Sequence, residues 1–133
     1  MRRLWTQATA LPEDLKATSD LVEAVGGADI VVMAVPSHGF REVLSRIVPI
    51  IGSDKPVLSL TKGIEQETLA TMTQVVSELL PDLDPGLIGV LAGPNLATEI
   101  AAGQPTAAVV AMRDIESRAR RRPKALGSRR SGR

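Results

Sequence analysis

The sequence predicts an α/β fold built on a mainly parallel β-sheet, and three observations support this. Short aliphatic runs alternate with stretches in which apolar residues recur every three or four positions, as is typical of βαβ units. The longest aliphatic run, residues 30–35, is unbroken, as expected for a strand covered by helices on both faces. Aromatic residues make up only 2% of the chain, so the core must be built from aliphatic side chains.

A short helix is expected at residues 21–25, before this strand. Asp20 can accept hydrogen bonds from the free N–H groups of the first turn, and Glu23 can reach back towards the helix start. Gly26 and Gly27 then stop the helix, because glycine readily adopts the backbone conformations of a helix end.

A longer amphipathic helix is expected after the strand. Pro36 ends the strand, and Ser37 is placed to cap the helix. Apolar residues then recur with helical periodicity until Gly52 closes the helix. The predicted apolar face consists of Phe40, Val43, Leu44, Ile47, Ile50 and Ile51.

The alternation of strands and helices continues through the rest of the chain. Residues 56–59 predict a second strand, and residues 69–80 predict a second amphipathic helix that ends before Pro81. Further strands are expected at residues 87–92 and 107–111. Together these elements predict one α/β sheet with connecting helices.

Composition limits the class of protein. A chain of 133 residues is long enough for one domain. The absence of cysteine excludes disulfides and thiolate chemistry, and the single histidine, His38, argues against a histidine-rich metal centre, so no metal site is predicted. No apolar run approaches the roughly 18 residues needed to cross a bilayer, and Arg2 and Arg3 precede no signal-like stretch. A cytoplasmic protein is therefore expected.

Charge is distributed unevenly along the chain. Residues 1–112 carry 7 Lys and Arg against 13 Asp and Glu, whereas residues 113–133 carry 9 against 2. We therefore expect a folded domain at 1–112 and a disordered basic tail at 113–133. Such a tail could bind nucleic acid or another acidic surface through phosphate contacts, although no aromatic residue for base stacking accompanies it.

Three loops after predicted strands carry the candidate chemistry. Sequential parallel strands place their carboxyl ends at one edge of the sheet, where α/β proteins bind ligands. The loops are those at Pro36, at Lys62 and at Gly93, and we expect them to converge. Lys62, between Thr61 and Gly63, is placed to hold an anion such as a phosphate or a carbonyl oxygen; the alternative is a solvated surface lysine.

The third loop leads into a short helix expected to reach Ala101. Gly93 permits a ligand to approach closely, and Asn95 starts a helix whose free N–H groups could bind an anion. The alternative is an ordinary turn with Asn95 as the helix cap. His38 is interpreted as a polar residue at a helix start rather than as a catalyst.

Three strings of residues, in this order and spacing, indicate a family. They are ADIVVMAVPS at 28–37, LTKGIE at 60–65 and GPNLATE at 93–99, with GQPT following at 103–106. Together they resemble bacterial NAD(P)-dependent glycerol-3-phosphate dehydrogenase, over about residues 11–111. The resemblance implies a partial doubly wound, Rossmann-like sheet with flanking helices. It also implies reduction of dihydroxyacetone phosphate to sn-glycerol 3-phosphate with NAD or NADP as cofactor, for glycerophospholipid synthesis.

The resemblance implies roles for individual residues. Lys62 would contact both substrate and cofactor, and Gly93 and Asn95 would line the substrate site. Ala97 would lie against the cofactor, and the loop at Pro36 would border it. The family often has serine where this chain has Asn95, whose amide can also donate and accept hydrogen bonds.

The resemblance also implies an incomplete enzyme. No G-x-G-x-x-G string, the usual start of a dinucleotide site, occurs in the chain. The family's proton-transfer lysine lies in a helical second domain, and nothing after Ala111 resembles that domain. Lys124 stands in the wrong context, so no catalytic residue is assigned. We expect a chain truncated at both ends and inactive alone, with a tail that resembles out-of-frame translation.

A second hydride-transferring family with a similar cofactor domain is an alternative. The pairing of the Thr61, Lys62 and Gly63 string with the GPN string at 93–95 argues against it.

Overall fold

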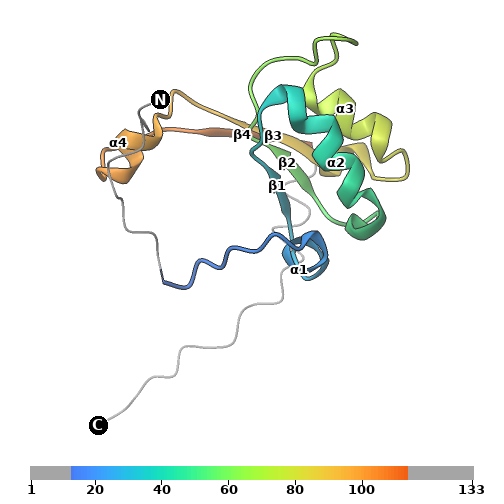
Figure 1. Ribbon diagram of the computed structural model, residues 1–133. Coiled ribbons are helices and arrows are strands. Elements are labelled where there is room, and N and C mark those ends of the chain that lie inside the picture. The colour runs from blue at the N-terminus through green and yellow to red at the C-terminus, as the bar shows by residue number, and fades with distance from the viewer. Residues whose placement is uncertain (1–12, 114–133) are drawn as a thin grey trace, which may run out of the picture.

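The computed structural model describes residues 13–113, and its strands form one four-stranded sheet in the order β1-β2-β3-β4 (Figure 1). Strands β1 (Val31–Met33), β2 (Val57–Ser59) and β3 (Ile88–Ala92) run parallel to one another. Strand β4 (Val109–Met112) runs antiparallel to β3. The predicted mainly parallel sheet is confirmed. The predicted basic tail lies outside the described residues, apart from its first residue.

Two helices lie side by side over one face of the sheet. They are α2 (Ser37–Ile51) and α3 (Met72–Leu79), which contact each other. Helix α1 (Leu21–Gly26) packs against α2, and the short helix α4 (Ala97–Ala101) lies beyond the end of β3, away from the other helices (Figure 1). A single 3₁₀ turn, η1 (Pro85–Leu87), leads into β3. The chain thus alternates between strands and helices, as the sequence predicted.

The core lies between the sheet and helices α2 and α3. Its largest fully buried apolar side chains are Phe40, Leu44, Ile51, Val57, Val75 and Val76. Apart from Phe40 these are aliphatic, as the composition required.

The strand predicted at 30–35 is shorter than expected and is not covered on both faces by the described residues. Its ordered part is β1, in which Val31 and Met33 face the helices and are buried. Val32, between them, points to the opposite face and is 49% exposed. Helices α2 and α3 cover only the face that carries Val31 and Met33. The continuous apolar run predicted that both faces would be covered, but the described residues cover only this one.

The start of α1 agrees with prediction, whereas that of α2 does not. Asp20 accepts hydrogen bonds from the N–H groups of Val22, at 2.8 Å, and Glu23, at 3.4 Å. The predicted cap at Ser37 is wrong, because Ser37 is already the first helical residue. Pro36 precedes it without a side-chain cap.

The starts of α3 and α4 were also misplaced. Helix α3 begins at Met72 rather than at Leu69, because Leu69 has a φ of +58° and cannot continue a helix. Thr71 caps it in a capping box with Gln74, which the sequence prediction missed. The predicted cap at Asn95 is wrong, because Leu96 occupies the capping position directly before α4.

Candidate functional site

The three predicted loops meet at the carboxyl edge of the parallel strands. Lys62 Nζ lies 3.4 Å from the carbonyl oxygen of Gly93 and donates to it. On the other side, Ser37 Oγ lies 3.8 Å from the point that a Cβ would occupy at Gly63. Segments that are 26 to 56 residues apart are thereby brought together, as expected from the parallel topology.

The backbone that precedes Lys62 is tied to the end of β1. Leu60 donates its N–H to the carbonyl of Met33 at 2.9 Å, and Thr61 Oγ1 donates to the carbonyl of Val35 at 2.6 Å. Ser59, which is fully buried, accepts from the N–H of Thr61 at 3.2 Å. Lys62 therefore leaves the sheet from a fixed backbone, with an exposed side chain.

The backbone that follows Lys62 forms a tight loop. Gly63 has a φ of +99°, in the region that favours glycine. Ile64 forms an isolated antiparallel bridge with Thr71, and Glu65 donates its N–H to the carbonyl of Ala70 at 2.9 Å. The loop from Lys62 to Thr71 is thus closed on itself before α3 begins.

An ion pair joins this loop to helix α2. Arg41 Nε and Nη2 contact the two carboxylate oxygens of Glu65 at 2.7 and 2.8 Å. Arg41 Nη2 also contacts Glu78 Oε2, on α3, at 2.7 Å, and Thr68 Oγ1 donates to Glu65 Oε2 at 2.5 Å. This group was not predicted from the sequence, since Arg41 stands 24 residues from Glu65 and no local pattern links them.

These contacts shift the pKa of both partners. The hydrogen bonds from Arg41, and then the one from Thr68, lower the pKa of Glu65 from 4.5 to about 2. Hydrogen bonds to Glu65 and Glu78 hold the pKa of Arg41 above its usual range. Both groups are charged throughout the neutral range, so the ion pair between Arg41 and Glu65 persists there.

Glu65 should give stability a pH dependence of defined sign. Because its pKa in the folded state, about 2, lies below the ordinary 4.5, its contribution is fully present above pH 4.5 and is lost as the pH falls towards 2. We expect the midpoint of urea unfolding to fall over this window in the parent chain and to fall less in Glu65→Gln. Glu67→Gln, at an exposed position of the same loop, is the control. An equal loss of this pH dependence in both variants would contradict its assignment to Glu65.

The third loop approaches Lys62 through a glycine that has no room for a side chain. A Cβ at Gly93 would lie 2.4 Å from the carbonyl oxygen of Ala107 and 2.7 Å from Asn95 Nδ2. Asn95 Oδ1 is buried and has no hydrogen-bond partner in the described structure. A buried acceptor of this kind requires an explanation, and a donor on a bound ligand would supply one.

The two residues predicted to border the cofactor lie on either side of this edge. Pro36 is exposed directly before α2, and Ala97 is exposed as the first residue of α4. Neither is linked to Lys62 by a hydrogen bond within residues 13–113. His38, the second residue of α2, is exposed as expected for a polar residue at a helix start.

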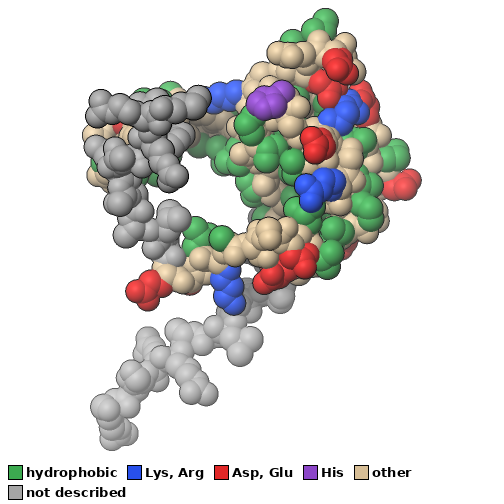
Figure 2. Space-filling view, in the orientation of Figure 1, with side chains coloured by type: hydrophobic (Ala, Val, Ile, Leu, Met, Phe, Trp, Pro, Cys, Tyr) green, Lys and Arg blue, Asp and Glu red, His purple; other side chains and the backbone are tan. Residues whose placement is uncertain are grey.

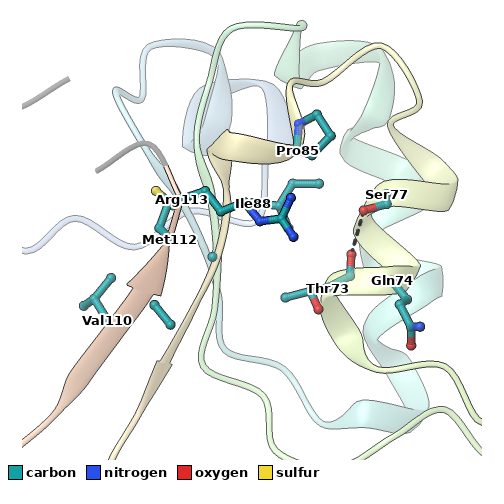
Figure 3. Close-up of a pocket in the computed structure, with 10 residues that line it drawn as sticks. Thr73, Gln74, Ser77, Pro85, Ile88, Val110, Met112 and Arg113 are labelled. Atoms are coloured by element: carbon teal, nitrogen blue, oxygen red, sulfur yellow. Dashed lines mark hydrogen bonds between the residues drawn. The ribbon is translucent and has the colours of Figure 1, made fainter. Parts of the chain in front are cut away.

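A hollow lies elsewhere, between α3 and the β3–β4 pair. It is an open groove of about 580 Å³ (Figure 3). Ser77 and Thr73 line its helical wall, and the Ser77 hydroxyl donates to the Thr73 carbonyl at 3.1 Å within the helix. Among the described residues, Arg113 is the one charged residue that lines it. None of the predicted site residues does, and so this groove does not serve the candidate site.

Other classes of site find no support in the part of the chain that the structure describes. Across residues 13–113, no three His, Asp or Glu side chains gather as metal ligands. No helix in this range is long and apolar enough to cross a membrane. Acidic and basic side chains are interspersed over helices α2 and α3 (Figure 2). The hypothesis of a nucleic-acid-binding tail concerns residues outside the described range and stays a prediction.

The parallel sheet, its flanking helices and the loops gathered at its carboxyl edge define a Rossmann-like domain, the class that binds dinucleotides. Comparison with known proteins identifies the family. The model for the N-terminus of NAD-dependent glycerol-3-phosphate dehydrogenase matches residues 4–118. The chain belongs to this family.

Similar proteins agree with this assignment. A glycerol-3-phosphate dehydrogenase (NAD(P)+) of Sphingopyxis alaskensis is 48% identical over 112 residues, which cover 84% of this chain and 33% of the relative. One from Mycobacterium avium is 50% identical over 104 residues, covering 78% of this chain and 30% of the relative. The crystal structure of the Coxiella burnetii glycerol-3-phosphate dehydrogenase is 34% identical, with a TM-score of 0.70, over 77% of this chain and 30% of that one. The chain thus spans about a third of the length of these relatives.

Proposed function

We propose that this chain forms the part of an NAD(P)-dependent glycerol-3-phosphate dehydrogenase that holds the substrate against the cofactor. The reaction is the reduction of dihydroxyacetone phosphate to sn-glycerol 3-phosphate, for glycerophospholipid synthesis. The observation that carries the proposal is the contact of Lys62 Nζ with the carbonyl of Gly93 at 3.4 Å, within a chain that belongs to this family.

Lys62 would bind an oxygen of the substrate. Its ammonium group keeps one weak contact at the site and is otherwise exposed, so it can donate to a carbonyl or phosphate oxygen. Asn95 would complete the pocket by accepting a hydrogen bond at its unpartnered Oδ1. Gly93 has no side chain, and this lets the backbone at Ala107 and the amide of Asn95 pack closely against the loop.

The residues present fit part of a nicotinamide site. The NAD or NADP cofactor supplies the hydride when bound. Pro36 and Ala97 are exposed and apolar, and can border a flat ring. No G-x-G-x-x-G phosphate loop occurs in the sequence, and Lys62 is the one cationic side chain among the predicted site residues. We therefore propose that the chain binds substrate weakly and does not turn it over alone. A cytoplasmic location stays a prediction.

Substitution of Lys62 tests this proposal. Dihydroxyacetone phosphate, titrated into the full chain, should perturb the NMR signals of the Lys62 and Gly93 amides. In Lys62→Met the affinity should fall about ten- to a hundredfold, because a hydrogen bond to a charged group contributes about 1.5–3 kcal/mol.

Lys16→Met is the matched control, since Lys16 is an exposed lysine far from this edge in the sequence. It should bind as the parent chain does. Unchanged affinity in Lys62→Met, or no perturbation of the parent chain by dihydroxyacetone phosphate, would contradict the proposed site. Oxidation of NADH by the chain with this substrate would overturn the proposed lack of turnover.

A further inference from the structure

We propose that Arg41 is a positioning residue for Lys62, because its ion pair with Glu65 holds the loop that carries the lysine at the edge of the sheet. The residues of this clamp are Arg41, Glu65 and Thr68. The consequence for substrate binding rests on the proposed function, whereas the effect on the loop does not.

Lys62 lies between two anchors of different kinds. Before it, the hydroxyl of Thr61 donates to the carbonyl of Val35, at the end of β1, at 2.6 Å. After it, Glu65 is held by Arg41 through two contacts of 2.7 and 2.8 Å. Only Gly63 and Ile64 separate Lys62 from the second anchor, so release of Glu65 frees the chain directly after the lysine.

The loop depends on this anchor because its own backbone is unfavourable. Leu69 has a φ of +58°, in the left-handed region, although its side chain is exposed. A bulky residue in this region is strained, and such strain persists only where surrounding contacts impose it. Apart from the bridge between Ile64 and Thr71, the loop is outside regular structure.

The clamp should act more strongly on the loop than on the whole fold. The side chains of Arg41 and Glu78 are 34% and 52% exposed, so their pair adds little to global stability. The side chain of Glu65 is only 15% exposed, and its contact with Arg41 is bidentate, a geometry that adds strength and direction. Removal of Arg41 therefore leaves a largely covered carboxylate without its main partner, at the base of the Lys62 loop.

Hydrogen exchange in the full chain tests the effect on the loop. In Arg41→Gln, the N–H groups of Glu65 and Leu69, which donate to carbonyls inside the loop, should exchange at least tenfold faster than in the parent chain. The amides of strand β2, which report global opening, should be accelerated by a clearly smaller factor. Arg46→Gln, an exposed arginine on the same helix, is the matched control and should leave both sets unchanged.

Two further variants separate positioning from a general structural role. In the double variant Arg41→Glu with Glu65→Arg, which reverses both charges, the loop amides should exchange slowly again. In either single variant they should exchange faster than in the parent chain. For affinity towards dihydroxyacetone phosphate, Arg41→Gln should weaken binding about tenfold in the parent chain. It should have no further effect in the Lys62→Met background, because Arg41 acts through Lys62.

The outcomes distinguish this inference from the proposed function. Unchanged loop exchange in Arg41→Gln, or equal acceleration of the loop and of β2, would overturn the positioning role. An equal loss of affinity with and without Lys62 would also overturn it. Faster loop exchange in Arg41→Gln, in a chain that does not bind dihydroxyacetone phosphate, would support the positioning role while the proposed function fails.

Discussion

Replacement of Gly93 by alanine is expected to lower the free energy of unfolding by about 1–3 kcal/mol and to displace the third loop from Lys62. The new Cβ would lie 2.4 Å from the carbonyl oxygen of Ala107 and 3.1 Å from the Cα of Ala108. Both are backbone atoms and cannot rotate away. Asn95 Nδ2, at 2.7 Å, would also have to move. This would disturb the side-chain amide that we propose binds the substrate.

The measurement is urea unfolding, together with the chemical shifts of the Lys62 and Asn95 side chains. Gly39→Ala is the matched control: a Cβ at Gly39 meets nothing within 4 Å, and Gly39 lies inside α2. The same substitution should there stabilise the chain by about 0.5–1 kcal/mol, because alanine favours a helix over glycine. A Gly93→Ala variant as stable as the parent chain would show that the loop is not packed as described.

Replacement of Phe40 by alanine should have the largest effect on the fold. Phe40 is 0% exposed and is the one aromatic side chain in the described core. Truncation of a buried phenylalanine costs about 3–5 kcal/mol, through lost burial and the cavity that remains. A small domain has only about 5–15 kcal/mol of stability in total, so Phe40→Ala should lose a large share of it.

Circular dichroism and urea unfolding measure this effect. Phe40→Leu, which keeps most of the apolar volume, should lose clearly less stability than Phe40→Ala. Phe40 also precedes Arg41 on α2, so unfolding in Phe40→Ala should release the Glu65 loop as well. A loss of less than about 1 kcal/mol in the free energy of unfolding of Phe40→Ala would be a fraction of the usual cost. Such a result, with a cooperative transition, would contradict the burial of this residue.

The arrangement of strands could be predicted because it depends on contiguous residues. The aliphatic runs that became β1, β2 and β3 each lie within six residues of sequence. The helices between them require parallel pairing. Strand β4 follows β3 without a long helical crossover, and it pairs antiparallel. The strand itself was predicted, but only pairing with β3 showed its direction.

Helix starts were less predictable, because a cap depends on the backbone of one residue. Ser37 and Asn95 have suitable side chains, but each stands at the wrong position relative to the first helical residue. Helix α1 shows a further contact that no local pattern announces. Lys55 Nζ donates to the carbonyls of Val25 and Gly26 at 3.0 and 2.7 Å, and so satisfies the end of that helix from a distant loop.

By itself, the sequence determined the family and the three loops of the candidate site, because both follow from short strings and from the order of strands. Lys62 and Gly93 were identified in this way. Only the tertiary structure decided how these loops are held. Arg41 meets Glu65 and Glu78 across 24 and 37 residues of chain, and such contacts arise only when α2 and α3 pack on the same face of the sheet. Local patterns specify which elements form, whereas the side chains that fix Lys62 are selected by packing between elements distant in the chain.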